Sequence, residues 1–476
     1  MPRRIFKIDE FYGIDQSRGE NALHAGMSPD ACNMDTESGS LKVAKGYVKH
    51  IDKPVPGKGD VHRLIRYKRR EGDQFVVVAG NEIYAYKNDD WALIHTYPDE
   101  IVNGKFGFAQ AQINSVDYLI IGCGEYPLIK YDGTDVTPFG STQMLSDMPV
   151  LYLVTYRSRL FAAGNPEHPN RLYWSQLPGG SRSVEDWRPA EASPNVEGGH
   201  AEVGNMSSDP IIALAALPNQ ILIFKRHSIY RLLGDRPGNF IIEEVDGKAE
   251  RLAFTSIVQN GSALYYLTDG GMIGFNGVNA QIMPDARRIG AFLKGVTTED
   301  TRGALNRDKL YFSARSADGA EEAMVVYDLM RGLYMIRRGF AIRDLCAWDG
   351  KLFLINNMRF VYRFGEGDTY DGAPINAWWK TPTTDLFDKG SVKAMRELYL
   401  RGEGGKAGDA LIVDVTVGRN TAAHRLLLPS VITDVLEVPL KNEGRTFSLR
   451  FYNEAGSYFS LDCGIELGFE QWRRVE

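Results

Sequence analysis

Residues that could bind a metal ion are dispersed along this chain. Zinc sites built from local motifs place His and Cys about two to five positions apart. No histidine here lies within five residues of another His or of a Cys; the eight are His24, His50, His62, His95, His168, His200, His227 and His424. Asp132 and Asp135, like Asp368 and Asp371, supply two carboxylates and then stop, whereas a calcium loop needs more oxygen ligands and a final Glu. The sequence therefore predicts no metal site and no cofactor.

Catalytic motifs are equally sparse. The Gly-rich stretch 402–408 has Leu400 and Ala407 where a phosphate-binding Walker loop needs Gly and Ser or Thr. Ser183-Val-Glu-Asp-Trp187 approaches the box repeated in sialidase propellers, but it occurs once and lacks the Gly. A Gly-x-Ser-x-Gly elbow is absent. Glycoside hydrolysis needs two facing carboxylates, and none of the 61 acidic residues is marked out as such a pair. We expect a protein with no catalytic residue and no enzymatic activity.

What does recur is a hairpin of two apolar strands. Seven copies are present, with second strands that end at Tyr86, Tyr131, Ser175, Leu232, Phe275, Tyr327 and Phe364. A hairpin repeated about every 40–50 residues is typical of β-propeller blades, which bury their apolar faces against one another. We predict an all-β fold with a six- or seven-bladed propeller over residues 61–387. One unit could be shared across the closure of the ring, which would leave six blades.

The flanking segments differ from the repeat. Residues 1–60 form a lead-in that could pack on the C-terminal part of the chain. Residues 388–476 alternate apolar strands with Gly-rich turns and lack the hairpin unit, which favours an appended β-sandwich-like platform domain. Helical periodicity is scarce and is suggestive only at 285–294.

Bulk composition limits the function classes. The net charge of -6 argues against a surface that grips nucleic acid, yet suits a wall past which DNA slides. The N-terminus has no signal-peptide pattern, and no run of about 18 apolar residues exists, so we expect synthesis in the cytoplasm and no membrane span. The four cysteines are far apart and no CxxC occurs, which favours reduced thiols.

The order of segments resembles the tail nozzle proteins of short-tailed bacteriophages, also described as tail hub or packaged-DNA stabilisation proteins. The segments that carry the resemblance are 33–41 with Gly46-Tyr47, Tyr156-Arg-Ser-Arg-Leu-Phe-Ala-Ala-Gly164, Arg171-Leu-Tyr-Trp-Ser-Gln176, Glu185-Asp-Trp187, Ile223-Phe-Lys-Arg-His-Ser-Ile-Tyr230 and Thr268-Asp-Gly-Gly-Met-Ile-Gly-Phe-Asn-Gly277. The resemblance implies a structural virion protein of the phage tail, assembled in the host cytoplasm. It implies a homo-oligomeric ring, commonly a hexamer, below the portal and its adaptor. Packaged double-stranded DNA would be retained in the ring's channel and conducted through it during ejection, without sequence-specific binding. Family members are usually described with six blades, whereas seven units are present here.

One long connection interrupts the repeat. Ser175–Pro210 is rich in Gly, Ser, Pro and Glu, and a connection of this length without its own core is usually functional or disordered. We name Arg182, Glu185, Asp186 and Trp187 within it as candidate interaction residues, facing either a channel or a ring contact. A structural rim loop is the competing interpretation. A carbohydrate-binding or glycan-hydrolysing propeller is the alternative function, and a monomeric scaffold for protein binding is the third.

Overall fold

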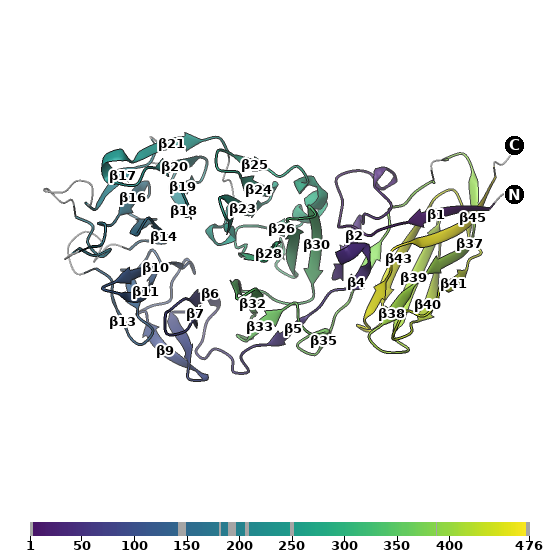
Figure 1. Ribbon diagram of the computed structural model, residues 1–476, viewed down its shortest axis with the longest axis horizontal. Coiled ribbons are helices and arrows are strands. Elements are labelled where there is room, and N and C mark those ends of the chain that lie inside the picture. Colours follow the sequence, from purple (N-terminus) through teal and green to yellow (C-terminus); the bar gives the residue numbers. More distant parts are fainter. Residues whose placement is uncertain are drawn as a thin grey trace.

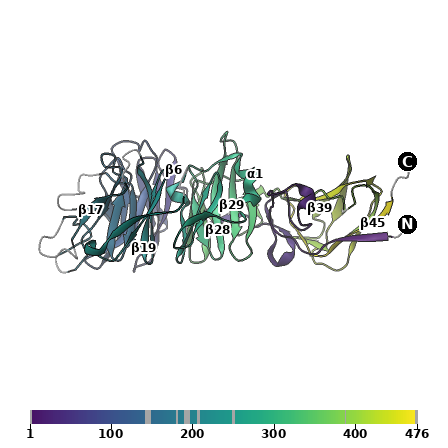
Figure 2. The same cartoon turned by 90° about the horizontal axis from the view of Figure 1, so that it is seen from above.

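The computed structural model describes residues 3–140, 149–179, 182–188, 197–204, 209–247, 252–386 and 388–472. It contains two β-rich bodies side by side, a propeller and a smaller sandwich, and both chain ends lie on the sandwich, far from the propeller (Figures 1 and 2). None of the helices within the described ranges has the length or apolar character that a membrane crossing requires.

Seven sheets form the blades of the propeller, and all their strand pairs are antiparallel except β5 (Tyr47–Lys49) with β34 (Thr369–Tyr370) in blade 7. Blade 1 is β6 (Val61–Tyr67), β7 (Gln74–Ala79), β8 (Glu82–Lys87) and β9 (Asp90–Thr96). Blade 2 is β10 (Gly107–Ile113), β11 (Val116–Gly122), β12 (Ile129–Tyr131) and β13 (Val136–Pro138). Blade 3 is β14 (Tyr152–Tyr156), β15 (Arg159–Ala163), β16 (Arg171–Trp174) and β17 (Gly199–Glu202). Blade 4 is β18 (Ile211–Leu217), β19 (Gln220–Lys225), β20 (Ile229–Leu233) and β21 (Ile241–Val245).

Blade 5 has the same four-strand order, whereas blades 6 and 7 have additional strands. Blade 5 is β22 (Val258–Asn260), β23 (Ala263–Thr268), β24 (Gly271–Phe275) and β25 (Ala280–Ile282). Blade 6 is β26 (Val296–Thr297), β27 (Gly303–Asn306), β28 (Lys309–Ser316), β29 (Glu322–Asp328) and β30 (Leu333–Arg338). Blade 7 is β31 (Asp344–Trp348), β32 (Lys351–Ile355) and β33 (Val361–Phe364), extended by β5 (Tyr47–Lys49), β34 (Thr369–Tyr370) and β35 (Ala373–Pro374).

The propeller is closed by a strand that precedes its first blade. β5 pairs antiparallel with β33, so the lead-in supplies the outer strand of blade 7, while β31 of that blade lies against β6 of blade 1. The predicted all-β propeller is confirmed, and the blade number is seven. The seventh hairpin unit therefore forms a complete blade together with β5, and the ring does not close with six blades.

The core of the propeller lies between blades. In β7, Val76 and Val78 pack toward blade 2, whereas Phe75, Val77 and Ala79 pack toward blade 7, and all five are buried. Because each sheet is covered on both faces, its second strand reads as a continuous apolar run and not as an alternating one.

The sandwich consists of three sheets. The first has β1 (Arg3–Ile8), β45 (Ile465–Trp472), β37 (Val392–Leu400), β41 (Leu436–Pro439) and β42 (Glu443–Gly444). The second has β2 (Asp30–Cys32), β36 (Trp378–Lys380), β43 (Phe447–Asn453), β39 (Ala410–Val417) and β40 (Asn420–Leu427). The third has β3 (Met34–Asp35), β4 (Leu41–Val43), β44 (Phe459–Leu461) and β38 (Gly402–Gly404). Strands from both ends of the chain therefore share these sheets.

Helices are few and short among the described residues. They are the 3-10 turns η1 (Glu20–Ala22), η2 (Glu37–Gly39), η3 (Pro237–Asn239), η4 (Phe254–Ser256) and η5 (Ala286–Ile289), and the α-helix α1 (Gly290–Leu293). The last two lie within the 285–294 stretch whose apolar spacing predicts helix.

A buried polar network joins the sandwich to blades 6 and 7. The Asn33 side-chain amide donates to the carbonyls of Arg338 (3.0 Å) and Asn376 (2.8 Å) and accepts from the Arg338 N–H (2.9 Å) and the Tyr370 hydroxyl (3.0 Å). The buried Arg337 guanidinium donates to the Met34 carbonyl and is paired with Asp35. One hydrophobic core continues from blade 6 into the sandwich, so the two bodies are packed as one unit.

Candidate functional site

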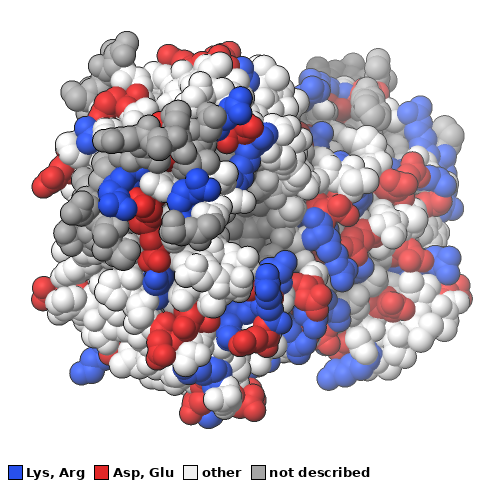
Figure 3. Space-filling model, turned by 60° about the vertical axis from the view of Figure 1, so that its left-hand side comes forward, with Lys and Arg blue, Asp and Glu red and all other residues white. Residues whose placement is uncertain are grey.

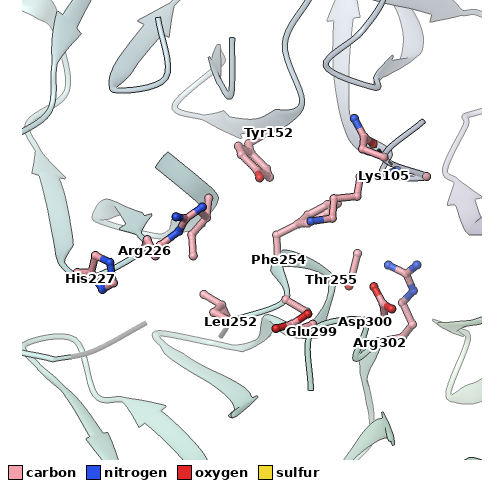
Figure 4. Close-up of a pocket in the computed structure, with 14 residues that line it drawn as sticks. Lys105, Tyr152, Arg226, His227, Leu252, Phe254, Thr255, Glu299, Asp300 and Arg302 are labelled. Carbon is pink, nitrogen blue, oxygen red and sulfur yellow. Dashed lines mark hydrogen bonds between the residues drawn. The ribbon is translucent and has the colours of Figure 1, made fainter. Parts of the chain in front are cut away.

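Three hollows of the propeller lie along its axis. A channel of about 420 Å³ is lined by the innermost strands of all seven blades. At one end it meets a cavity of about 560 Å³, shown in Figure 4, and a smaller one of about 240 Å³ that shares Asn103, Gly104, Asp300 and Arg302 with it. We call the 560 Å³ space the axial cavity.

One wall of the axial cavity is the turn that leads into blade 2. The Glu125 carboxylate accepts the backbone N–H groups of Val102 (3.1 Å) and Asn103 (3.0 Å), and the Asn103 side chain accepts the N–H of Lys105 (2.6 Å). The turn is therefore fixed by its own hydrogen bonds before any ligand arrives. Val102 stands on it with 93% of its side chain exposed.

The apolar part of the lining comes from blades 3 to 5. The rings of Tyr152 and Phe254 meet edge to face with centroids 5.3 Å apart, and Ile212 and Leu252 complete the apolar lining. Burial raises the pKa of the Tyr152 phenol to about 12, so this hydroxyl stays protonated. The Thr255 hydroxyl donates to the Thr301 carbonyl (2.7 Å), which ties η4 to the neighbouring loop.

Charged side chains of both signs stand around these apolar groups. Figure 4 shows Arg226 and Lys105 at separate places on the wall, with Glu299 and Asp300 together on the loop below Phe254. Within the described part of the chain, none of these four side chains forms an ion pair or a side-chain hydrogen bond. Arg302, beside Asp300, donates through Nε to the Arg343 carbonyl (3.3 Å), and burial lowers its pKa.

This arrangement has the character of a binding site more than of a reaction centre. Glu299 and Asp300 come from one loop and lie on one wall, whereas two carboxylates that cleave a glycosidic bond must flank it. No group of three or more potential metal ligands was found among the described residues. The lining offers apolar contact, three cations (Lys105, Arg226 and Arg302) and two anions (Glu299 and Asp300), which can orient a bound molecule that carries both kinds of group.

The residues that the sequence indicated lie elsewhere, on the outer side of blades 2 and 3. Trp187 is 1% exposed and packs into the core between these blades, near Phe139. Glu185 is paired with Lys130 at 2.6 Å, both mostly buried, and it also accepts the Gly140 N–H. Both side chains hold the segment onto the propeller, and an interaction role for them stays a prediction.

The other two candidates are less engaged. Asp186 is paired with the exposed Arg188 at 2.9 Å, which holds its pKa below the ordinary range, although burial opposes this. Arg182 forms a backbone bridge with Gly179. An interaction role for Asp186 and Arg182 stays a prediction. Parts of the Ser175–Pro210 connection lie outside the described residues, so the channel or ring contact predicted for it stays a prediction.

Sequence reasoning missed the axial cavity. Its charged residues come from one loop between blades (Lys105) and from two loops within blades (Arg226 in blade 4, Glu299 and Asp300 in blade 6), and they are separated by up to about 200 positions in the sequence. No local motif joins them. The available signal is only that loops at one end of the blades converge on the axis.

No protein-family model and no curated protein matches the chain. Solved structures with a similar arrangement include BBS1N in complex with ARL6DN, with 11% identity, 68% of this chain and 98% of that chain covered and a TM-score of 0.42. The WD40 domain of Neurospora crassa Pan2 has 9% identity, 68% and 95% coverage and a TM-score of 0.41. BamB from Moraxella catarrhalis has 11% identity, 68% and 97% coverage and a TM-score of 0.33. No function is carried over from them, and the strand order itself defines the chain as a seven-bladed β-propeller joined to a β-sandwich.

Proposed function

We propose that this chain is a structural subunit of the tail of a short-tailed bacteriophage, and that copies of it close into a ring below the portal and its adaptor. The ring, commonly of six subunits in the family that the sequence resembles, would retain packaged double-stranded DNA and conduct it during ejection. Identity as a tail protein is supported by the resemblance of segments such as 156–164 and 268–277.

The observation that carries the structural role is the rigid union of propeller and sandwich. Asn33 and Arg337 are buried and Asp35 is partly buried at the junction, and all three are hydrogen-bonded across it. Burying these groups is tolerable only while their partners stay in place, so hinge motion at the junction is costly. A subunit that keeps a fixed shape suits a ring whose function is mechanical.

The axis of the propeller is not the route for DNA in this proposal. The channel along it has a volume of only about 420 Å³ and is lined by side chains such as Phe108 and Arg66. A DNA duplex, whose major groove alone is about 12 Å wide, is too large to fit in this space. DNA would instead pass through the centre of the ring of subunits. The face in Figure 3 intersperses acidic and basic side chains without a broad basic field, as expected for a wall to which DNA does not adhere.

Negative-stain images of the purified chain, alone and at high concentration, test the proposal. Closed rings with a stained central hole wide enough for a duplex are expected. Images that show only single elongated particles, even at concentrations near those of virion assembly, would count against it.

Hydrolysis of a glycan is not favoured by the site. The described axial cavity places its two unpaired carboxylates, Glu299 and Asp300, on the same loop.

A further inference from the structure

We propose that the axial cavity is a docking site for an extended peptide segment of a partner protein, one in which an apolar side chain is flanked by an acidic and a basic residue. The inference does not depend on ring formation. It describes a small binding site for a partner protein, in addition to the contacts between subunits of the proposed ring.

The apolar part of the lining accounts for the central side chain. Tyr152, Phe254, Ile212 and Leu252 form the apolar part of the lining of a space of about 560 Å³, which lies within the range of pockets that enclose compact ligands. Val102 lies on the adjoining turn and is 93% exposed. A partner chain that crosses this turn would cover that apolar side chain.

The charges account for the flanking residues. Lys105 and Arg226 would pair with the acidic residue of the segment, and Glu299 and Asp300 with its basic one. All four are exposed and, in the described part of the chain, without ion pairs, so no internal salt bridge must break before the segment binds.

The same charges disfavour other ligand classes. A nucleotide or free phosphate would meet Glu299 and Asp300 beside the cations Lys105, Arg226 and Arg302, and the two carboxylates oppose its binding. A neutral glycan would leave both pairs of charges without partners. A peptide with both signs satisfies all of them and supplies an apolar group as well.

The site is also formed in advance of binding. The turn that bears Lys105 is held by Glu125, and the Thr255 hydroxyl is hydrogen-bonded to the Thr301 carbonyl. The N–H of His227, next to Arg226, donates to Asp209 (2.9 Å). Fixed walls lower the entropy that binding must overcome, so even a short segment can have measurable affinity.

The first measurement uses the intact chain and five defined probes, and the binding of each probe is measured by saturation-transfer NMR and calorimetry. Two are the pentapeptides acetyl-Asp-Gly-Phe-Gly-Lys-amide and acetyl-Lys-Gly-Phe-Gly-Asp-amide, which differ in direction. The third replaces Phe by Gly. ATP and chitotriose represent phosphates and glycans. We expect at least one Phe-containing pentapeptide to bind in the millimolar range or tighter, and the Gly peptide, ATP and chitotriose to bind at least 10-fold more weakly.

Charge reversal locates the binding. Lys105→Glu combined with Arg226→Glu is expected to weaken the better peptide at least 5-fold, and acetyl-Lys-Gly-Phe-Gly-Lys-amide is expected to bind this variant more tightly than the parent chain. Lys441→Glu, an exposed change on the sandwich, is the matched control and leaves affinity unchanged. Three results would overturn the proposal. One is that no Phe-containing peptide binds with a dissociation constant below 10 mM, and another is that the double variant binds the better peptide as tightly as the Lys441→Glu control does. The third is that ATP or chitotriose binds at the cavity more tightly than the peptides.

Discussion

Replacing Asn33 by Ala removes the centre of the junction between propeller and sandwich. Asn33 is 2% exposed, and its side chain makes four hydrogen bonds, to groups of blade 6, blade 7 and the segment that enters β36. A net value of about 1 kcal/mol for each bond gives a loss of about 4 kcal/mol.

The backbone adds to this loss. Asn33 has a φ of 54°, a left-handed conformation that Asn tolerates and that costs other L-residues about 1 kcal/mol more. We therefore expect Asn33→Ala to lower the free energy of unfolding by about 4 to 5 kcal/mol, which is a large share of the total for most domains. Asn33→Gly loses the same hydrogen bonds without the strain, so it is expected to be about 1 kcal/mol less destabilising.

Urea titration at 25 °C, followed by tryptophan fluorescence, measures both variants, because Trp379 reports on the sandwich and Trp187 on the propeller. Asn420→Ala, at an exposed position on the edge strand β40, is the control and is expected to change stability by less than about 0.5 kcal/mol. A loss below about 1.5 kcal/mol for Asn33→Ala, or one equal to that of the control, would refute the argument that this network fixes the junction.

Three further outcomes are expected. Arg337→Met leaves Asp35 without its partner and is expected to lower the free energy of unfolding, measured by thermal unfolding, by about 3 kcal/mol. The double variant Arg337→Met with Asp35→Asn should lose less stability, and equal losses would contradict a coupled pair. Trp187→Ala is expected to cost about 3 to 5 kcal/mol and to speed proteolysis near blade 3; an unaltered cleavage rate would show that the ring is not part of the core. Burial lowers the pKa of His62 and His95 below 6.5, so the unfolded chain binds more protons below that value. The free energy of unfolding should therefore fall as the pH is lowered from 7 to 5, and it should fall less steeply in His62→Gln. The same dependence of stability on pH in this variant and in the parent chain would exclude His62 as a contributor.

The local part of the fold was accessible from the sequence, because a hairpin is made of neighbours. Runs such as Phe75–Ala79 show the apolar character of a strand covered on both faces. The way the ring closes was not accessible, since β5 pairs with β33 more than 300 positions away and its short sequence carries no sign of that partner. Blade number depended on that one pairing.

The candidate site shows the same division. Trp187 stands in a polar stretch and suggests an exposed contact, but its burial depends on Phe139 and on strands of two blades that only the folded chain brings together. Lys105, Arg226 and Glu299 are ordinary charged loop residues, and their meeting at the axis follows from the radial arrangement of blades. Secondary-structure propensities and the hydrophobic pattern of the sequence describe neighbouring residues, so they cannot predict such distant contacts.

Multi-angle light scattering on the purified full chain tests the proposed role most directly. Its subunit mass is 53.2 kDa. The account predicts a concentration-dependent species with the mass of a closed ring, commonly six subunits, that dissociates to the monomer on dilution. A mass that stays at one subunit up to millimolar concentration, with the portal adaptor present as well as absent, would contradict the ring.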